Sequence, residues 1–346
     1  MNIKDVAQMA GVSISTISRV INNTAYVSPE IKERIEQVLA ETGYRPNSLA
    51  KELLRNKTNT IGVLLPRIDL GTFAVIVSGI SSVLTENQYN IILANTFDKD
   101  EEELRYLDLF YTKRVDGILW FATGIEEKHR LAISRLRIPV VIVGQSGQFL
   151  DSPAIRMDNF GAARAMVKYL ISLGHRRIGC IGVSDHDENI GRLRREGYVA
   201  ALADEGIPFD PELVVTGDFE YPSGERGASI LMNATTKLPT AIYCITDRLA
   251  IAVSAWLQKN GYKVPQDVSV ACLDDPEVLS YTTPAITTMS FDYVETGKLA
   301  ANMIISCING ETTDTQEVIM PYTLKERESV KNIIPRLQED QNGIRC

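Results

Sequence analysis

The sequence of 346 residues predicts an α/β body of two doubly wound parallel sheets behind a small all-α head. Three observations support this fold class. From residue 60 onward, short continuous apolar runs alternate with amphipathic helical patterns, as in parallel sheets that are covered on both faces. About 270 residues of this pattern exceed a single sheet domain, so two lobes are expected. Residues 1–43 instead carry three amphipathic helical patterns.

The first two predicted helices form a helix-turn-helix. Asn2 can cap a helix over residues 4–10 that Gly11 ends, and a second helix follows over residues 14–22. Its outward face carries short hydroxyl side chains and an arginine, which would let the backbone approach a DNA groove closely. A three-helix module that does not bind DNA would show the same pattern. The candidate DNA-contacting residues here are Ser13, Ile14, Ser15, Thr16, Ser18, Arg19 and Asn22.

A third helix and a hinge complete the N-terminal region. Ser28 and Pro29 predict the start of the third helix, and Gly43 predicts its end. Residues 49–55 could form only one or two helical turns, which are marginal in water without a partner such as DNA or a second copy. Apolar side chains in this segment suit a wedge into a minor-groove step, with docking onto the body as the alternative. The candidate hinge residues are Asn47, Ala50 and Leu53.

The segments VAQMAGVSISTISRVIN and GYRPNSLAKELL resemble the head and hinge of the LacI/GalR family of repressors, and the resemblance continues to about residue 330. It implies a head over residues 1–46, a hinge and linker over 47–59, a body like the two-lobe periplasmic binding proteins over 60–330 and a polar tail over 331–346. The lobes would cross near Asp158, Thr288 and Pro321. It also implies a homodimer on double-stranded operator DNA, released by a small-molecule effector between the lobes.

The body shows eight candidate strands, most of them continuous apolar runs. Helices are expected between them, over residues 104–113, 160–173 and 248–260 among others. The candidate strands cover residues 61–65, 91–95, 117–121, 140–144, 178–183, 241–246, 268–273 and 287–291.

Polar and aromatic side chains cluster just after these strands, where open α/β sheets bind ligands. Sugars are held by bidentate polar groups on hydroxyl pairs and by an aromatic face against the ring. By resemblance, Arg194 and Asp274 match effector contacts of the family. Trp120 and Tyr293 are further aromatic candidates, although Tyr293 could equally belong to the core. The candidate effector-binding residues are Arg67, Phe73, Gln145, Asn189, Arg192, Arg194, Thr246, Asp274 and Phe291.

Three of these candidates are arginines: Arg67, Arg192 and Arg194. Three guanidinium groups exceed what a neutral sugar requires, and arginine forks suit phosphate. Segments such as LPRIDL and CITDRLAIA are similar to the trehalose-repressor type within the family. We therefore expect a disaccharide phosphate as the effector, with a neutral oligosaccharide as the alternative.

Charge and composition limit the other classes of protein to which the chain could belong. The chain has a net charge of −8, yet residues 1–60 carry eight basic and six acidic residues, which fits a small basic head on an acidic body. The longest apolar runs, about seven residues, are far below the ~18–20 that cross a bilayer, so no membrane partner is expected. The start of the sequence lacks a secretory pattern. The five scattered cysteines form no CxxC pair, so neither a metal site nor a disulfide is expected, and a cytoplasmic location fits.

No catalytic or cofactor-binding motif is present. The sequence lacks GxGxxG after its first strand, a Walker loop, HExxH and GxSxG, and His129, His175 and His186 are separate. We therefore expect a regulator without a cofactor and not an enzyme. A cytoplasmic sugar-binding module and an effector-dependent activator remain alternatives. The tail lacks a leucine heptad repeat, which favours a dimer over a coiled-coil tetramer.

Overall fold

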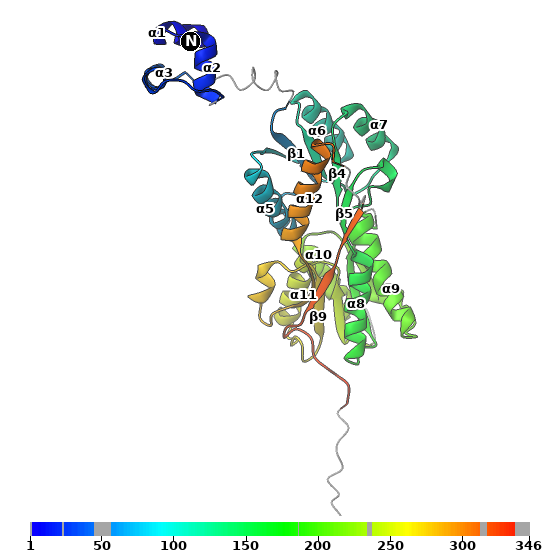
Figure 1. Ribbon diagram of the computed structural model, residues 1–346. Coiled ribbons are helices and arrows are strands. Elements are labelled where there is room, and N and C mark those ends of the chain that lie inside the picture. The colour runs from blue at the N-terminus through cyan, green and yellow to red at the C-terminus, as the bar shows by residue number, and fades with distance from the viewer. Residues whose placement is uncertain are drawn as a thin grey trace, which may run out of the picture. The chain divides into compact units, whose positions relative to one another are not determined.

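The chain divides into two compact units, Met1–Thr58 and Asn59–Cys346. The computed structural model describes residues 2–22, 24–44, 57–185, 187–233, 237–311 and 317–335 (Figure 1). Within these residues, no helix combines the length and the apolar character that a membrane span requires.

The head contains three helices, α1 (Ile3–Ala10), α2 (Ile14–Asn22) and α3 (Pro29–Thr42). Asn2 caps α1 in a capping box: its Oδ1 accepts the backbone N–H of Lys4 at 2.9 Å, and its own N–H donates to the Asp5 carboxylate at 2.8 Å. Gly11 has φ of +63°, a left-handed conformation that lets the chain turn directly into α2.

One small apolar core holds the three head helices together. Ile17 from α2 and Ile35 from α3 are fully buried against Val6 from α1. This packing fixes which side of α2 faces inward, so Ser15 and Arg19 on the opposite side are exposed.

The body contains two six-stranded sheets, each of which forms a lobe with its covering helices. In lobe 1 all neighbouring strands are parallel. Its sheet has the order β11-β5-β4-β3-β1-β2, with β1 Thr60–Leu65, β2 Asn90–Asn95, β3 Gly117–Phe121, β4 Val140–Val143, β5 Ala154–Met157 and β11 Glu317–Met320. Its helices are α5 Gly71–Glu86, α6 Asp100–Thr112, α7 Glu127–Leu136 and α12 Tyr293–Ile308.

Lobe 2 repeats this design with one antiparallel edge strand, β12, which pairs with β10. Its sheet has the order β12-β10-β9-β8-β6-β7, with β6 Ile178–Val183, β7 Val214–Gly217, β8 Ala241–Cys244, β9 Ser269–Leu273, β10 Thr287–Phe291 and β12 Tyr322–Lys325. Its α-helices are α8 Asn159–Ser172, α9 Leu193–Asp204, α10 Tyr221–Asn233 and α11 Asp247–Lys259.

The central strands are apolar along their whole length because both faces of each sheet are covered. In β1, Ile61 and Val63 pack on the side of α5, whereas Leu64 packs with Phe110 from α6. The fold class predicted from the continuous apolar runs is thus confirmed.

The chain passes between the lobes three times. It leaves lobe 1 at Asp158, between β5 and α8, returns at Asp292, between β10 and α12, and crosses again at Pro321, between β11 and β12. The second passage lies four residues after the predicted position, because Thr288 is a buried residue inside β10.

Two glycines allow α5 and α12 to pack side by side in lobe 1, as Figure 1 shows. A Cβ on Gly79 would lie 2.2 Å from the Val294 carbonyl oxygen, and one on Gly297 would lie 2.1 Å from the Ile76 carbonyl oxygen. The helix backbones therefore meet at a distance that no side chain would permit.

The structure contains four strands that the apolar runs did not reveal: β5, β7, β11 and β12. Each has only four residues, and the burial patterns of β7, β11 and β12 are mostly half-exposed. They lie toward the sheet edges, where continuous apolar sequence is not required.

Candidate functional site

The N-terminal end of α2 presents a row of hydroxyl groups. Ser13 Oγ lies 2.7 Å from Ser15 Oγ and 2.8 Å from Thr16 Oγ1, and it accepts the Thr16 backbone N–H at 3.2 Å. Ile14 is 42% exposed beside them. An exposed helix N-terminus with small hydroxyls can approach an anion closely and donate to it.

Further along α2, Ser18 is half-buried and Arg19 is exposed. The backbone of Asn22 ends the helix. The predicted DNA-contacting residues from Ile14 to Asn22 thus all belong to α2, and Ile17 on the same helix is buried in the head core. The predicted hinge residues Asn47, Ala50 and Leu53 lie outside the described residues.

In the body, the carboxyl ends of strands from both sheets carry the predicted effector residues. The central interaction joins Arg194 of α9 to Asp274 after β9. The Arg194 Nη1 and Nη2 donate to the two Asp274 carboxylate oxygens at 2.8 and 2.9 Å. Both side chains are buried, with 1% and 4% of their surfaces exposed. A buried guanidinium requires such a partner, because an unpaired charge in the interior is costly.

Three further groups fix the orientation of this pair. Arg194 Nε donates to Asn159 Oδ1 at 2.8 Å, and its Nη1 also donates to the Ile245 carbonyl oxygen at 2.6 Å. The Tyr293 hydroxyl donates to the Asp274 carboxylate. Asp274 has φ of +72°, and its carbonyl oxygen accepts from Thr288 Oγ1 at 2.6 Å.

Several polar atoms around this pair are buried without a partner. Among the described residues, no hydrogen bond reaches Asn159 Nδ2, Thr246 Oγ1 or the Tyr243 hydroxyl. Buried polar atoms are rarely left unpaired, and each costs about 1–3 kcal/mol. Groups of this kind indicate a place for a ligand or for water.

Two carboxyl groups near the pair have perturbed acidity. Burial raises the pKa of Asp247 to about 6, and the negative charge of Asp274 adds to the rise. Burial also raises the pKa of Asp187, and Asp98 from lobe 1 contributes in the same direction. Perturbed carboxyls in a cleft are typical of functional sites.

A π-helical turn, Glu188–Arg192, positions the residues between β6 and α9. The Asp187 carboxylate caps it by accepting the Ile190 N–H at 2.8 Å. Gly191 is required here, since a Cβ would lie 2.0 Å from the Ser184 carbonyl oxygen. π-helical turns are rare and are frequently found at functional sites.

Two pockets of similar size lie between the lobes. One, of about 350 Å³, brings the predicted residues Gln145 and Asn189 together with Arg156 from β5. The other, of about 340 Å³, includes the predicted Phe291 together with Thr72. Arg156 was not predicted from the sequence, because no motif surrounds it. Its place in the pocket follows from β5, a strand that the apolar runs did not reveal.

The aromatic candidates lie in different surroundings. Trp120 is fully buried in lobe 1, with its ring centroid 5.2 Å from that of His129, so its interpretation as a sugar-stacking face is wrong. Phe73 is half-buried and meets Phe121 edge-on at 5.6 Å. Phe291 is buried with its ring centroid 6.0 Å from that of Tyr293.

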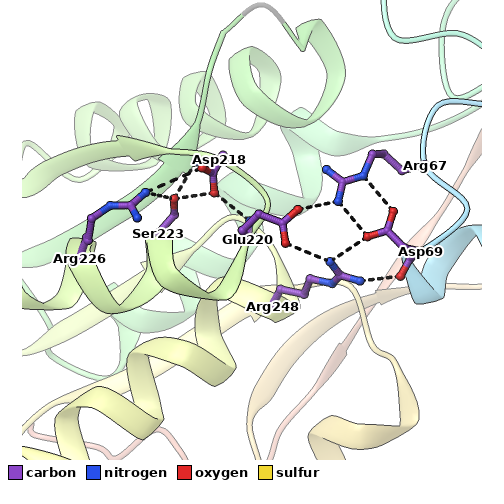
Figure 2. Close-up of polar contacts among 7 residues, drawn as sticks. All are labelled: Arg67, Asp69, Asp218, Glu220, Ser223, Arg226 and Arg248. Atoms are coloured by element: carbon purple, nitrogen blue, oxygen red, sulfur yellow. Dashed lines mark hydrogen bonds and ion pairs between the residues drawn. The ribbon is translucent and has the colours of Figure 1, made fainter. Parts of the chain in front are cut away.

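The expectation of three available guanidinium groups is wrong. Arg67 forms two hydrogen bonds with Asp69, at 2.9 and 2.8 Å, and a third with Glu220 at 2.6 Å (Figure 2). Arg192 pairs with Glu188 and Glu196. With Arg194 bound to Asp274, each arginine already has a carboxylate partner. Three of these partners lie within four positions of their arginine, whereas Glu220 is 153 positions from Arg67 and Asp274 is 80 positions from Arg194.

One group in lobe 1, formed by Asp100, Glu103 and His129, has atoms close enough to hold a metal ion. His129 Nδ1 accepts the Glu126 backbone N–H at 3.1 Å, which places the proton of a neutral ring on Nε2, 3.2 Å from a Glu103 oxygen. The Lys128 ammonium binds Asp100. A cation would have to displace that proton and that ammonium, so the geometry favours a helix cap and an internal pair.

Comparisons with known proteins cover nearly the whole chain. Residues 2–47 match the model of bacterial regulatory proteins of the lacI family, and residues 167–330 match a periplasmic binding protein-like domain. Catabolite control protein A of Streptococcus mutans is 31% identical over 331 residues, 96% of this chain and 98% of that protein. The ribose operon repressor of Escherichia coli K12 is 34% identical over 327 residues, 94% and 98% of the two chains.

Solved structures give the same picture. The lac repressor dimer bound to operator and the anti-inducer ONPF is 25% identical, with a TM-score of 0.85 over 96% of this chain and 99% of that one. The complex of the regulator CelR with cellobiose is 29% identical, with a TM-score of 0.71 over 95% and 99%. Since relatives above 30% identity align over nearly their full length, the chain belongs to the lacI family of bacterial transcription regulators.

Proposed function

We propose that the protein is a homodimeric repressor of carbohydrate-utilisation genes, released from a near-palindromic operator by a sugar bound between its lobes. The observation that carries the effector half is the buried Arg194–Asp274 pair beside the unpartnered atoms of Asn159, Thr246 and Tyr243. A sugar hydroxyl both donates and accepts, so a polyhydroxyl ring can satisfy such mixed groups.

The geometry favours an uncharged sugar over the disaccharide phosphate expected from the sequence. The arginines at the cleft are paired with carboxylates, whereas a phosphate site would need at least one free guanidinium fork. Relatives named for the ribose operon and a relative solved with cellobiose support a sugar of this kind.

The operator half rests on α2. Ser15, Thr16 and Arg19 would enter the major groove, while Leu53 of the hinge would open a minor-groove step between the two half-sites. We propose that the protein acts in the cytoplasm and that it catalyses no reaction. The solved lac repressor, described as a dimer bound to operator, supports the proposed binding of a dimer to DNA.

A surface of lobe 1 suits pairing with a second copy. The edge strand β2 exposes Ile92 and Leu93, and Phe97 after it is 63% exposed. Val75 on α5 is exposed as well. Apolar side chains gathered around a sheet edge commonly mark a protein interface.

Coupling requires that effector and operator favour different angles between the lobes. The three passages at Asp158, Asp292 and Pro321 allow the lobes to move about a common hinge. Linkage is reciprocal, so the factor by which sugar weakens operator binding must equal the factor by which operator weakens sugar binding.

Fluorescence anisotropy with labelled DNA from upstream of the gene tests the proposal. Tight, salt-dependent binding that a free sugar reverses is expected. Sugar that strengthens DNA binding would instead indicate an effector-dependent activator. A chain lacking residues 1–58 should bind sugar and not DNA, and a protein whose function survives this deletion would be a sugar-binding module.

A further inference from the structure

Four charged side chains form a closed ring at the cleft between the lobes. Arg67 and Asp69 follow β1 in lobe 1, whereas Glu220 precedes α10 and Arg248 lies in the first turn of α11 in lobe 2. Arg67 Nη2 contacts Asp69 Oδ2 at 2.8 Å and Glu220 Oε1 at 2.6 Å. Arg248 Nη1 lies 3.3 Å from Asp69 Oδ2 and 3.7 Å from Glu220 Oε2. Figure 2 shows that each carboxylate lies between two arginines.

Both arginines of the ring are bound to carboxylates. Hydrogen bonds from Arg67 hold the pKa of Asp69 well below its usual range, so Asp69 stays ionised. The arginine side chains are only 27% and 17% exposed. A diffusing anion must therefore compete with a carboxylate two residues from Arg67 in the same loop and with a second one that the other lobe supplies.

Glu220 is itself held in place. Its backbone N–H donates to Asp218 Oδ1 at 2.9 Å, and the Ser223 hydroxyl donates to the same carboxylate, which Arg226 also approaches at 3.8 Å. The carboxylate of Glu220 is thus presented to Arg67 from a loop that is already hydrogen-bonded.

The remaining charges near the cleft are unfavourable for an anion. Arg192 and Arg194 are paired with carboxylates. Within the described part of the chain, Asp98, Asp187 and Asp247 form no ion pair. An entering phosphate would meet these carboxyl groups, and the arginines described around the cleft already hold carboxylate partners.

We propose that Asp69 and Glu220 determine effector specificity: by occupying Arg67 and Arg248, they exclude phosphorylated sugars from the cleft and leave it to uncharged ones. This inference rests on the proposed function only in taking the cleft as the effector site. It assigns to two carboxylates a negative role, the masking of an anion site that the arginines alone would form.

The test uses the full chain and inorganic phosphate as the probe, measured by isothermal titration. The wild-type protein should show no saturable binding. The double variant Asp69→Asn, Glu220→Gln frees both guanidinium groups and should show saturable phosphate binding, roughly tenfold or more tighter than the weakest binding that the titration can detect, as charge-assisted bonds to an arginine fork imply. Adding Arg67→Gln and Arg248→Gln to this variant should abolish the gain.

A matched control separates masking from net charge. Glu102→Gln with Glu127→Gln makes the same charge change and frees Arg105 and Arg130 on the exposed helices α6 and α7. This control should gain nothing. Saturable phosphate binding by the wild type, an equal gain in the control, or no gain in the double variant would each overturn the inference. Thermal melting verifies that each variant is folded.

A parallel titration with free trehalose and trehalose 6-phosphate keeps the two proposals apart. Failure of every free sugar to release operator would count against the proposed function and leave the phosphate result unchanged. A phosphate ester that binds the wild type more tightly than its free sugar would overturn the masking role alone.

Discussion

Arg194 and Asp274, 80 positions apart in the sequence, meet through two hydrogen bonds of 2.8 and 2.9 Å in the interior of lobe 2. The pair links α9 to the carboxyl end of β9 and leaves neither charge exposed. Removal of one partner would leave the other as an isolated buried charge, so the two side chains act as one unit in stability.

The variant Arg194→Gln should lower the free energy of unfolding by about 3–5 kcal/mol and abolish the response to sugar. Urea unfolding can be followed by tryptophan fluorescence, because both tryptophans, Trp120 and Trp256, lie in the body. The neighbouring Arg195 pairs with Asp185 at the surface. The control Arg195→Gln should therefore cost less than ~1 kcal/mol. Equal losses in the two variants would contradict a special role for the buried pair.

The variant Arg19→Ala should weaken operator binding by about 10- to 100-fold without changing sugar affinity, because Arg19 lies on the exposed side of α2. If Arg19 contacts a phosphate, the slope of log affinity against log salt should fall by about one. Anisotropy titrations at several salt concentrations measure both quantities, and Arg105→Ala in the body serves as the control. Unchanged operator affinity would remove α2 from the interface.

The variant Gly297→Ala should destabilise the body by about 1–3 kcal/mol or more, because the added Cβ would lie 2.1 Å from a carbonyl oxygen of α5. Gly71, at the start of α5, has no atom within 4 Å of such a Cβ. The control Gly71→Ala should accordingly be neutral or slightly stabilising. Thermal melting of both variants is sufficient, and a stable Gly297→Ala protein would argue against the close packing of α5 and α12.

Stability should fall in mild acid through His175. This buried ring lies between Thr240 Oγ1, at 3.0 Å, and the Lys331 carbonyl oxygen, at 3.1 Å, and burial lowers its pKa. The unfolded chain, with a histidine pKa near ~6.5, takes up the proton first as the pH falls. The stabilisation is therefore complete above ~6.5 and is lost as the pH falls through the lower folded value.

The variant His175→Asn should show a smaller loss of unfolding free energy between about pH 7.5 and 5.5 than the wild type. Urea unfolding at the two pH values gives the comparison. Parallel losses in both proteins would mean that other groups carry the acid sensitivity.

Local signals in the sequence predicted much of this structure. The capping box at Asn2, the turn at Gly11 and the strands β1 to β4, β6 and β8 to β10 each follow from side chains within a few positions. Arg194 and Asp274 were each predicted to contact the effector, and this stays a prediction. Their motifs did not reveal that the two side chains bind each other.

Several interactions that sequence reasoning missed depend on distant partners. Asp69 is two positions from Arg67, but only the folded chain brings Glu220 to Arg67 and Arg248 to both carboxylates. The burial of Trp120 was missed for a related reason. Both faces of its strand are covered, and a continuous apolar run does not tell which neighbours the indole ring will contact. Periodicity predicts that a position is buried, whereas the identity of its neighbour depends on topology.

The path of the chain also bears on how the protein is made. Lobe 1 takes α12 and its edge strand β11 from residues beyond 292, which leave the ribosome after nearly all of lobe 2. Until α12 has been synthesised, the face of α5 around Gly79 has no helix to pack against. The central strands of lobe 1 also lack the helix that covers part of one face of the sheet. Lobe 1 therefore cannot complete its fold until nearly all of lobe 2 has been synthesised.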